Sequence, residues 1–198
     1  MNNNFKYNPF SGISYDDIED LIVPRFNIEN IIHKIHNAES LAIEFYGKKG
    51  RGKTTHLIYI QKQLNEYPLF KLNAGDSFAD ILNNKSSVVF VDAIDHLNIY
   101  HRIELFKKKK VIIYTTHWTK KFECLLARKN NYSLKFNGIN NDTLRYIINK
   151  RLRLAAHENS KYKMITNENI ASLIKIFGDN YRGIINHLYE NYQWKEPR

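Results

Sequence analysis

Residues 47–54 have the composition and spacing needed to hold a phosphate group. They read Gly-Lys-Lys-Gly-Arg-Gly-Lys-Thr, which satisfies the pattern G-x-x-x-x-G-K-[ST] in full. Glycines let consecutive backbone N–H groups turn inward around an anion, because they carry no Cβ. Lys53 is long enough to reach the β- and γ-phosphates of a nucleotide, and Thr54 offers a hydroxyl to Mg²⁺. The segment therefore predicts a phosphate-binding loop, with the candidate contact residues Gly47, Gly50, Arg51, Gly52, Lys53, Thr54 and Thr55.

A second chemical signal is the segment 88–92, in which four apolar residues precede an acid. A carboxylate at the end of a strand beside a phosphate loop holds Mg²⁺ directly or through water, and Asp92 is the candidate. Many ATPases with such a phosphate-binding loop have a glutamate directly after the acid that corresponds to Asp92. This chain has Ala93 there, and its next acid is Asp95. Two roles for Asp95 stay open: it is the base that positions the attacking water, or it caps a following helix. Ala93 argues against fast hydrolysis and leaves nucleotide binding intact.

These residues need a scaffold, and the apolar pattern predicts one. Short apolar runs alternate with helical spacing, which is typical of a parallel sheet flanked by helices. The expected strands are 41–46, 69–72, 88–91, 111–115 and 132–136. The expected helices between them are 54–64, 94–106 and 122–128. We therefore predict an α/β fold in which the phosphate loop follows the first strand and opens a helix.

The pattern changes after residue 140, where apolar residues fall at helical spacing in three successive groups. Thr166 is a candidate N-cap of the middle helix, with Glu168 in its first turn, and Gly178 ends that helix. We expect two domains: residues 1–137 form an N-terminal segment plus the α/β domain, and residues 138–198 form a small three-helix lid.

With these elements in order, the chain resembles the AAA+ superfamily of P-loop ATPases over nearly its whole length. Residues 111–117 look like the sensor-1 strand, which implies that Thr116 or His117 lies near the γ-phosphate. Arg128 stands where such proteins carry an arginine finger, which reaches the nucleotide of a neighbouring subunit. The alternative for Arg128 is a solvated arginine that stabilises the end of a helix.

The resemblance extends to both ends of the chain. Residues 178–182, Gly-Asp-Asn-Tyr-Arg, look like the sensor-2 motif of the AAA+ lid, which implies that Arg182 points at the phosphates. Its alternative is an ordinary surface arginine. Residues 8–10 and 23–25, the latter containing Pro24, resemble the segment that wraps the adenine ring in these proteins.

Within the superfamily the resemblance leaves three functions open. The compact lid is similar to those of initiators, helicase loaders and transposon-encoded regulators, which implies a slow ATPase that oligomerises with ATP and acts as an assembly factor on DNA. The Asp-Ala-Ile-Asp segment at 92–95 looks like the D-x-x-D pattern of STAND-type signalling ATPases, which recruit protein partners. A third possibility, motivated by Ala93, is a scaffold that binds ATP without hydrolysing it. ATP and Mg²⁺ are the expected cofactors.

The charge balance favours a polyanionic partner. The 198 residues contain 30 Lys and Arg against 20 Asp and Glu, a formal net charge of +10. Basic clusters lie at 48–51, 107–110, 120–121 and 150–153. Each is either a contact for nucleic-acid phosphates, without sequence specificity, or a solvated charged face. We expect DNA, a protein partner and further copies of the chain as partners.

Cellular location is bounded by composition. The lone Cys124 excludes a disulfide within the chain, which fits a reducing cytoplasm. Residues 1–20 contain four acids and no continuous apolar stretch, so they do not resemble a signal peptide. No window approaches the roughly 20 apolar residues of a membrane helix. We expect a cytoplasmic protein without membrane association.

Overall fold

The computed structural model describes residues 4–75 and 78–192, and the chain divides into two compact units. The α/β unit is Pro24–Phe136, and the helical unit combines Met1–Val23 with Asn137–Arg198. The N-terminal segment thus belongs to the helical unit and not, as the sequence pattern predicted, to the α/β part. The reason is packing: Phe5 and Phe10 are buried in the apolar core of the helical unit.

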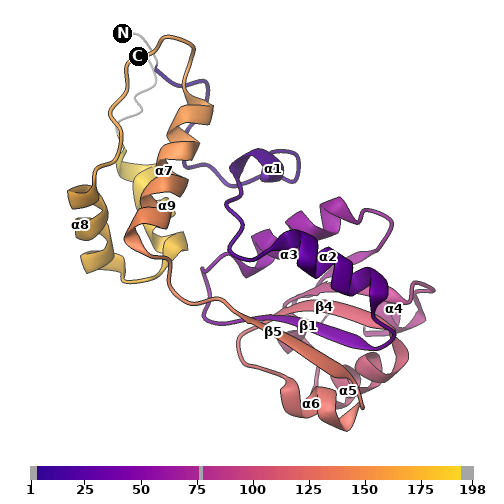
Figure 1. The fold of residues 1–198 in the computed structure, drawn as a ribbon. Helices are drawn as coiled ribbons and strands as arrows, with labels where there is room; N and C mark the ends of the chain where they lie inside the picture. The colour runs from indigo at the N-terminus through magenta and orange to yellow at the C-terminus, as the bar shows by residue number, and fades with distance from the viewer. Residues whose placement is uncertain (1–3, 76–77, 193–198) are drawn as a thin grey trace. The chain divides into compact units, whose positions relative to one another are not determined.

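The α/β unit is built on one five-stranded sheet. Its strands are β1 (Leu41–Tyr46), β2 (Leu69–Lys71), β3 (Val88–Asp92), β4 (Val111–Thr116) and β5 (Asn130–Lys135). They pair in the order β2-β3-β4-β1-β5, and every pairing is parallel (Figure 1). The prediction of a parallel sheet is confirmed, and so is each expected strand, within two residues of its bounds.

Helices cover both faces of this sheet, because the strand side chains alternate between two apolar cores. The helices are α2 (Ile28–Asn37), α3 (Lys53–Gln63), α4 (Phe78–Asn83), α5 (Ile99–Lys108) and α6 (Lys121–Leu126), with a 3₁₀ turn η1 (Ile94–His96). Ile43 and Phe45 face a core shared with α2 and α3, whereas Ala42 faces the core under α5 and α6. Figure 1 shows α2 and α3 over one face, and α5 and α6 over the other.

Two helical predictions need correction. The expected helix at 94–106 is interrupted, because the Asn98 side chain accepts a hydrogen bond from His101 N and starts α5 anew. A further helix, α2, was not predicted from the sequence; Ile31 and Ile35 are buried in it and Asn27 is its N-cap. Asn27 lies just before Ile28, the first apolar residue of α2, and an Asn in that position is a local sequence signal for a helix start.

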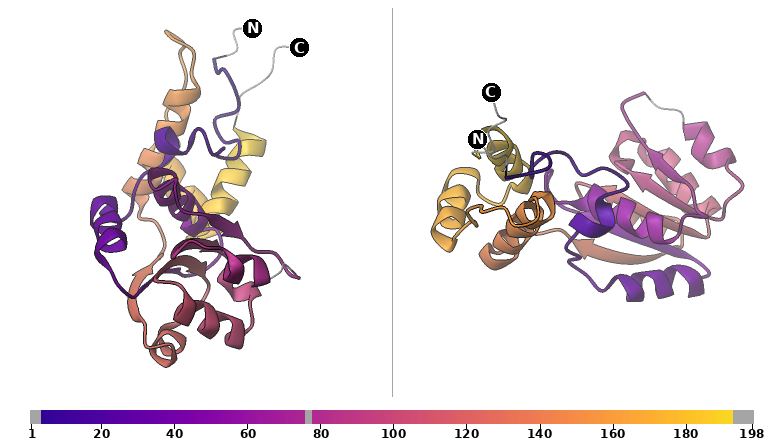
Figure 2. Two further views of the ribbon diagram at one scale, coloured as in Figure 1. Left: turned by 90° about the vertical axis from the view of Figure 1, so that its right-hand side faces the viewer. Right: turned by 90° about the horizontal axis from the view of Figure 1, so that it is seen from above.

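The helical unit contains α1 (Ile18–Leu21), α7 (Asn141–Ala155), α8 (Asn167–Phe177) and α9 (Tyr181–Asn191), and the last three lie together, orange to yellow, in Figure 2. The three predicted helices are confirmed. Thr166 and Asn169 form a reciprocal capping box at the start of α8, and Gly178, at a φ of 57°, ends it. Among the described residues no helix is both long enough and apolar enough to cross a membrane.

Candidate functional site

The phosphate loop runs from the end of β1 to the start of α3, as predicted. Gly47 N donates to Thr116 O over 3.3 Å, which ties the start of the loop to the end of β4. Gly47 has a φ of 138°, and a Cβ at this position would lie 2.6 Å from Phe136 O. No other residue type fits there without displacing the backbone.

The far end of the loop is the N-terminus of α3. Gly52 is the N-cap residue at a φ of 83°, a left-handed conformation that only glycine adopts without strain. Backbone N–H groups at a helix N-terminus attract anions. The Lys53 Nζ donates to Gly47 O over 2.6 Å and to Lys48 O over 2.9 Å, so the ammonium group lies across the loop. Thr54 and Thr55 follow in the first turn of α3.

A polar contact joins the loop helix to the acidic strand. The Thr54 hydroxyl donates to Asp92 Oδ1 over 3.0 Å, and the Thr115 hydroxyl donates to the same oxygen over 2.5 Å. The Thr115 hydroxyl also accepts a bond from Ala93 N, over 2.8 Å. Thr54 and Asp92 therefore bring a hydroxyl and a carboxylate together, and oxygen donors of this kind suit Mg²⁺.

The described residues contain no cluster of three or more His, Cys, Asp or Glu side chains able to hold a metal ion. This is compatible with Mg²⁺, which keeps several waters and is bound by one or two protein ligands together with substrate phosphates. The donor set thus fits a nucleotide-bound magnesium ion better than a metal caged by protein alone.

Asp95 lies in η1 and accepts hydrogen bonds from three neighbouring residues. Its carboxylate accepts from the Thr116 hydroxyl over 2.8 Å, from His117 N over 2.7 Å and from Lys120 Nζ over 2.8 Å. Burial raises the pKa of this carboxyl, but the bonds from Lys120, His117 and Thr116 and the charge of Lys120 outweigh it and lower the pKa to about 2. A group with so low a pKa is a weak proton acceptor.

The alternative role of Asp95, as a helix cap, is contradicted by the geometry. Ala93 occupies the N-cap position of η1, and the side chain that caps α5 is Asn98. Asp95 instead connects η1 to the end of β4. Thr116 and His117, the two sensor-1 candidates, both contact it, and His117 Nδ1 lies 3.0 Å from Asp95 Oδ2. The structure therefore places both candidates beside Asp95.

A buried aromatic cluster behind the loop was missed by the sequence analysis. The ring of His56, on α3, packs edge-on against Phe136 with ring centroids 5.0 Å apart, and Phe26 packs against Phe136 at 5.1 Å. The guanidinium of Arg25 lies 5.3 Å from the centroid of the Phe136 ring. Arg51 is buried and donates from Nη1 to Phe136 O over 3.3 Å. The cluster thus joins the loop to the segment after Pro24.

His56 has a defined protonation state in this cluster. Its Nε2 accepts a bond from Arg25 N over 3.2 Å, so its Nδ1 carries the proton and donates to Gly52 O over 2.9 Å. Burial lowers the pKa of His56 to about 4, with the charge of Arg25 adding to the effect and the bond to Gly52 opposing it. Pro24, a candidate adenine contact, is exposed and directly precedes Arg25, whose backbone N–H makes the bond to His56.

Solved structures with the same architecture are known, although no protein-family model matches the sequence and no curated protein sequence is significantly similar to it. The ORC1 protein of Aeropyrum pernix, in complex with DNA, aligns with 100% of this chain and 68% of its own, at a TM-score of 0.66 and 13% identity. AMPPCP-bound DnaA from Aquifex aeolicus aligns with 89% of this chain and 64% of its own, at 0.59 and 18%.

A DNA replication initiation factor aligns with 86% of this chain and 62% of its own, at a TM-score of 0.57 and 18% identity. This chain therefore spans less than two thirds of the length of that factor and of DnaA. The three are AAA+ P-loop ATPases. This chain has the AAA+ fold.

In this AAA+ fold the two candidate arginines lie in different units. Arg128 is exposed, between α6 and β5, at the end of the sheet where the parallel strands begin. The phosphate loop follows β1 at the other end, where the strands finish, about 20 Å away along a six-residue strand. Arg182 is exposed in the first turn of α9, in the helical unit.

Arg128 also has a strained backbone, with a φ of 54°. Left-handed conformations are unfavourable for residues other than glycine, and such strain is often retained at functional positions. Ala93, beside the candidate magnesium ligand, has a φ of 60°.

The basic clusters divide into exposed and internal residues, so part of the expected DNA-contacting charge needs correction. Lys109 is buried and donates to the carbonyls of Asn84 and Ser86. Lys120 is bonded to Asp95, and buried Arg151 donates to Pro9 O and Ser11 O. Exposed basic side chains of the same clusters remain at positions 48, 49, 107, 108, 121 and 153.

Proposed function

We propose that this protein binds ATP and Mg²⁺ and uses the nucleotide to control its assembly on DNA. The observation that carries the proposal is the contact between the Thr54 hydroxyl and Asp92 Oδ1, at 3.0 Å, beside a loop whose glycines have positive φ. That arrangement supplies a loop of backbone N–H groups for phosphate, the ammonium group of Lys53, and two oxygen ligands for Mg²⁺, from Thr54 and Asp92. All of them lie at the end of the parallel sheet where the strands finish.

Each site residue has a proposed role. The backbone of Gly47, Gly50, Arg51 and Gly52 holds the phosphates, together with Lys53 and Thr55. Thr54 and Asp92 hold Mg²⁺, which when bound neutralises charge on the β- and γ-phosphates.

The remaining residues act around the nucleotide. Pro24 contacts the adenine, Thr116 senses the γ-phosphate, Asp95 orients Thr116 and His117, and Arg182 reaches the phosphates from the lid.

Arg128 is proposed to act on the nucleotide of a neighbouring copy. It lies at the end of the sheet opposite the loop of its own chain, which supports a contact in trans. A positive charge placed where transition-state charge develops accelerates phosphoryl transfer. ATP then favours one subunit contact and ADP another, which is the logic of a nucleotide switch.

The proposed action on DNA is supported by two observations. The chain carries a net charge of +10. The structures that share its fold include ORC1 in complex with DNA and a DNA replication initiation factor. Partner proteins and a cytoplasmic location belong to the same proposal.

The test is assembly measured by sedimentation with and without ATP. We expect the wild type to form larger species with ATP·Mg²⁺, and Lys53→Ala to stay in its unassembled state. Filter binding of DNA across a salt series is the second arm. Assembly unchanged in Lys53→Ala rejects the nucleotide switch, and absence of DNA retention at low salt rejects the action on DNA and favours a signalling switch that recruits proteins.

A second candidate, an ATP-binding scaffold without turnover, is favoured by the low pKa of Asp95 and by Ala93 in place of glutamate. Phosphate release separates the two candidates. Release by the wild type that disappears in Asp95→Asn contradicts the scaffold, and no release under conditions of ATP saturation contradicts the switch driven by hydrolysis.

A further inference from the structure

An exposed apolar and basic surface lies on α6 and on the loop before it. Among its large apolar side chains, Trp118 is 78% exposed, Phe122 67% and Leu125 71%. Lys121 is exposed on the same segment. We propose that this surface, the α6 face, binds single-stranded nucleic acid. The inference rests on the proposed action on DNA and names the site and the form of the nucleic acid.

Exposing these side chains is costly in water, and Trp118, Phe122 and Leu125 lie within eight residues of one another in the sequence. Burying a large apolar side chain contributes about 2 kcal/mol, so a stable protein that leaves three of them exposed forgoes a substantial free energy. Single exposed apolar residues need no explanation, whereas a contiguous group marks an interaction site. Phe122 and Leu125 are three residues apart on α6 and so lie on one side of the helix.

Trp118 is presented on a fixed backbone. Its carbonyl lies 2.9 Å from the Thr116 hydroxyl, the hydroxyl of Thr119 donates to buried Glu44, and Lys120 N donates to Glu44 Oε2 over 2.8 Å. Because the residues on both sides are anchored inward, the exposed indole is held outward on an ordered loop. An aromatic ring fixed in this way loses little conformational entropy when a ligand stacks on it.

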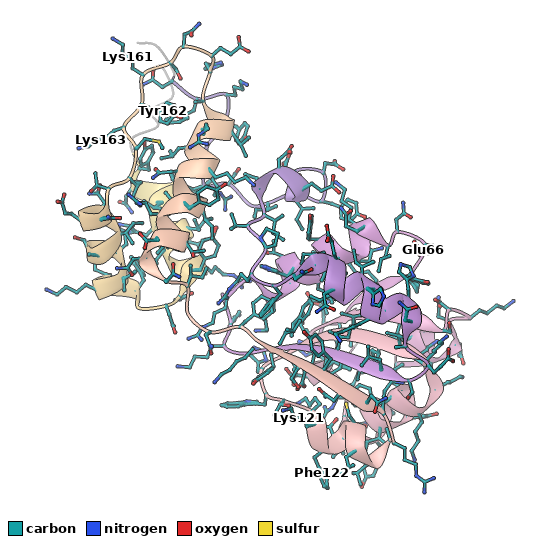
Figure 3. All side chains as sticks on the ribbon, in the orientation of Figure 1. Glu66, Lys121, Phe122, Lys161, Tyr162 and Lys163 are labelled. Atoms are coloured by element: carbon teal, nitrogen blue, oxygen red, sulfur yellow. The ribbon has the colours of Figure 1, made fainter. Side chains whose placement is uncertain are left out.

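The charge around these rings is positive. Residues 117–130 contain four Lys and Arg and one acid; Lys120 pairs with Asp95 and Lys129 is buried, whereas Lys121 is exposed beside the rings. The acid, Glu123, is buried and paired with Arg102, whose Nε and Nη2 donate to its two oxygens over 2.6 and 2.8 Å. Glu123 therefore presents no free charge to a ligand, and exposed Lys121 supplies positive charge beside the rings. Figure 3 labels Lys121 and Phe122 on α6, at the outside of this unit.

The combination selects unpaired nucleic acid. Exposed aromatic rings beside basic side chains bind single strands by stacking on bases and neutralising phosphates. A duplex offers Trp118 and Phe122 no open base face, because its bases are stacked on one another. In this arrangement Trp118 and Phe122 stack on bases, Leu125 covers sugar or base surface, and Lys121 contacts a phosphate.

The experiment measures fluorescence anisotropy of a labelled 20-nucleotide oligo-dT with the full chain at low salt. We expect Trp118→Ala and Phe122→Ala each to weaken binding about tenfold, as the loss of one stacked base does. Lys121→Ala should lower the slope of log affinity against log salt by about 0.7, the value for one phosphate contact on a single strand. Matched controls are Tyr100→Ala, an aromatic exposed on α5, and Lys85→Ala, an exposed lysine before β3.

The outcomes separate this inference from the proposed function, because ATP binding is measured on the same samples. If the wild type binds oligo-dT and the α6-face variants bind equally well, the α6 face is not the site, although the action on DNA stands. If duplex of the same length binds more tightly than oligo-dT, the preference for single strands is wrong. If Trp118→Ala abolishes self-association or capture of a protein and leaves oligo-dT binding intact, the face is a protein interface and the inference is overturned.

Discussion

The Nε2 of His56 accepts a hydrogen bond from the backbone N–H of Arg25 over 3.2 Å. The bond joins the first turn of the phosphate-loop helix to the segment that directly follows Pro24. Because the other ring nitrogen donates to Gly52 O, neutral His56 bridges that segment and the loop at once. Protonation of Nε2 removes the acceptor, so the bridge requires the neutral imidazole.

Acidification should therefore weaken the fold in a window set by His56. Its pKa is about 4 in the folded protein against 6.5 for the unfolded chain, so the unfolded state binds the proton first as pH falls. The stabilisation is complete above pH 6.5 and is lost progressively towards pH 4, a total of about 3 kcal/mol. Denaturant unfolding at pH 7.5 and pH 5.0 measures it.

The control for this prediction is His56→Asn, which has no titrating ring. We expect the variant to be less stable at pH 7.5 and to lose about 2 kcal/mol less than the wild type between the two pH values. Equal losses in the two proteins would show that His56 does not titrate in this window.

Gly47 is predicted to be irreplaceable for the fold of the loop. In Gly47→Ala the new Cβ meets Phe136 O at 2.6 Å, and the backbone at φ 138° is unfavourable for alanine. We expect a loss of about 2 kcal/mol or more in the free energy of unfolding. Gly12→Ala is the matched control, since a Cβ there meets nothing within 4 Å. The prediction fails if the two variants are equally stable.

Arg128 is expected to lower the stability of the fold through its backbone strain and to support phosphate release through its guanidinium group. Replacing it with glycine relieves the left-handed backbone at φ 54°, so Arg128→Gly should raise the free energy of unfolding by about 1 kcal/mol. The same variant should lose the phosphate release that depends on assembly, because the guanidinium is gone.

Arg128→Ala separates the two effects, since alanine keeps the strain and removes the charge. We expect it to lose activity without gaining stability. If both variants release phosphate as fast as the wild type, Arg128 is a surface residue and the contact in trans is wrong.

The sheet and the loop were predictable because their signals are local. The β1 strand, the glycines at 47–52 and the acid that ends β3 are each set by a few adjacent residues. The cluster around His56 was not, because its contacts span 31 residues to Arg25 and Arg51 lies 85 residues from Phe136.

Buried cations were the other failure of prediction. In sequence Lys109 belongs to a run of four lysines and has the pattern of a solvated face. In the structure it is buried, and Lys129, also buried, donates to the carbonyls of Lys109 and Lys110. Only the fold brings these carbonyls together, so composition alone overstated the charge available to DNA.

The central claim is tested most directly by calorimetry of ATP·Mg²⁺ binding to the wild type, to Lys53→Ala and to Thr54→Ala. The account predicts saturable binding by the wild type at one site per chain. It predicts binding lost in Lys53→Ala, and in Thr54→Ala an affinity that no longer rises when Mg²⁺ is added. Absence of heat with the wild type, or equal binding by all three proteins, would contradict the assignment of this loop as a nucleotide site.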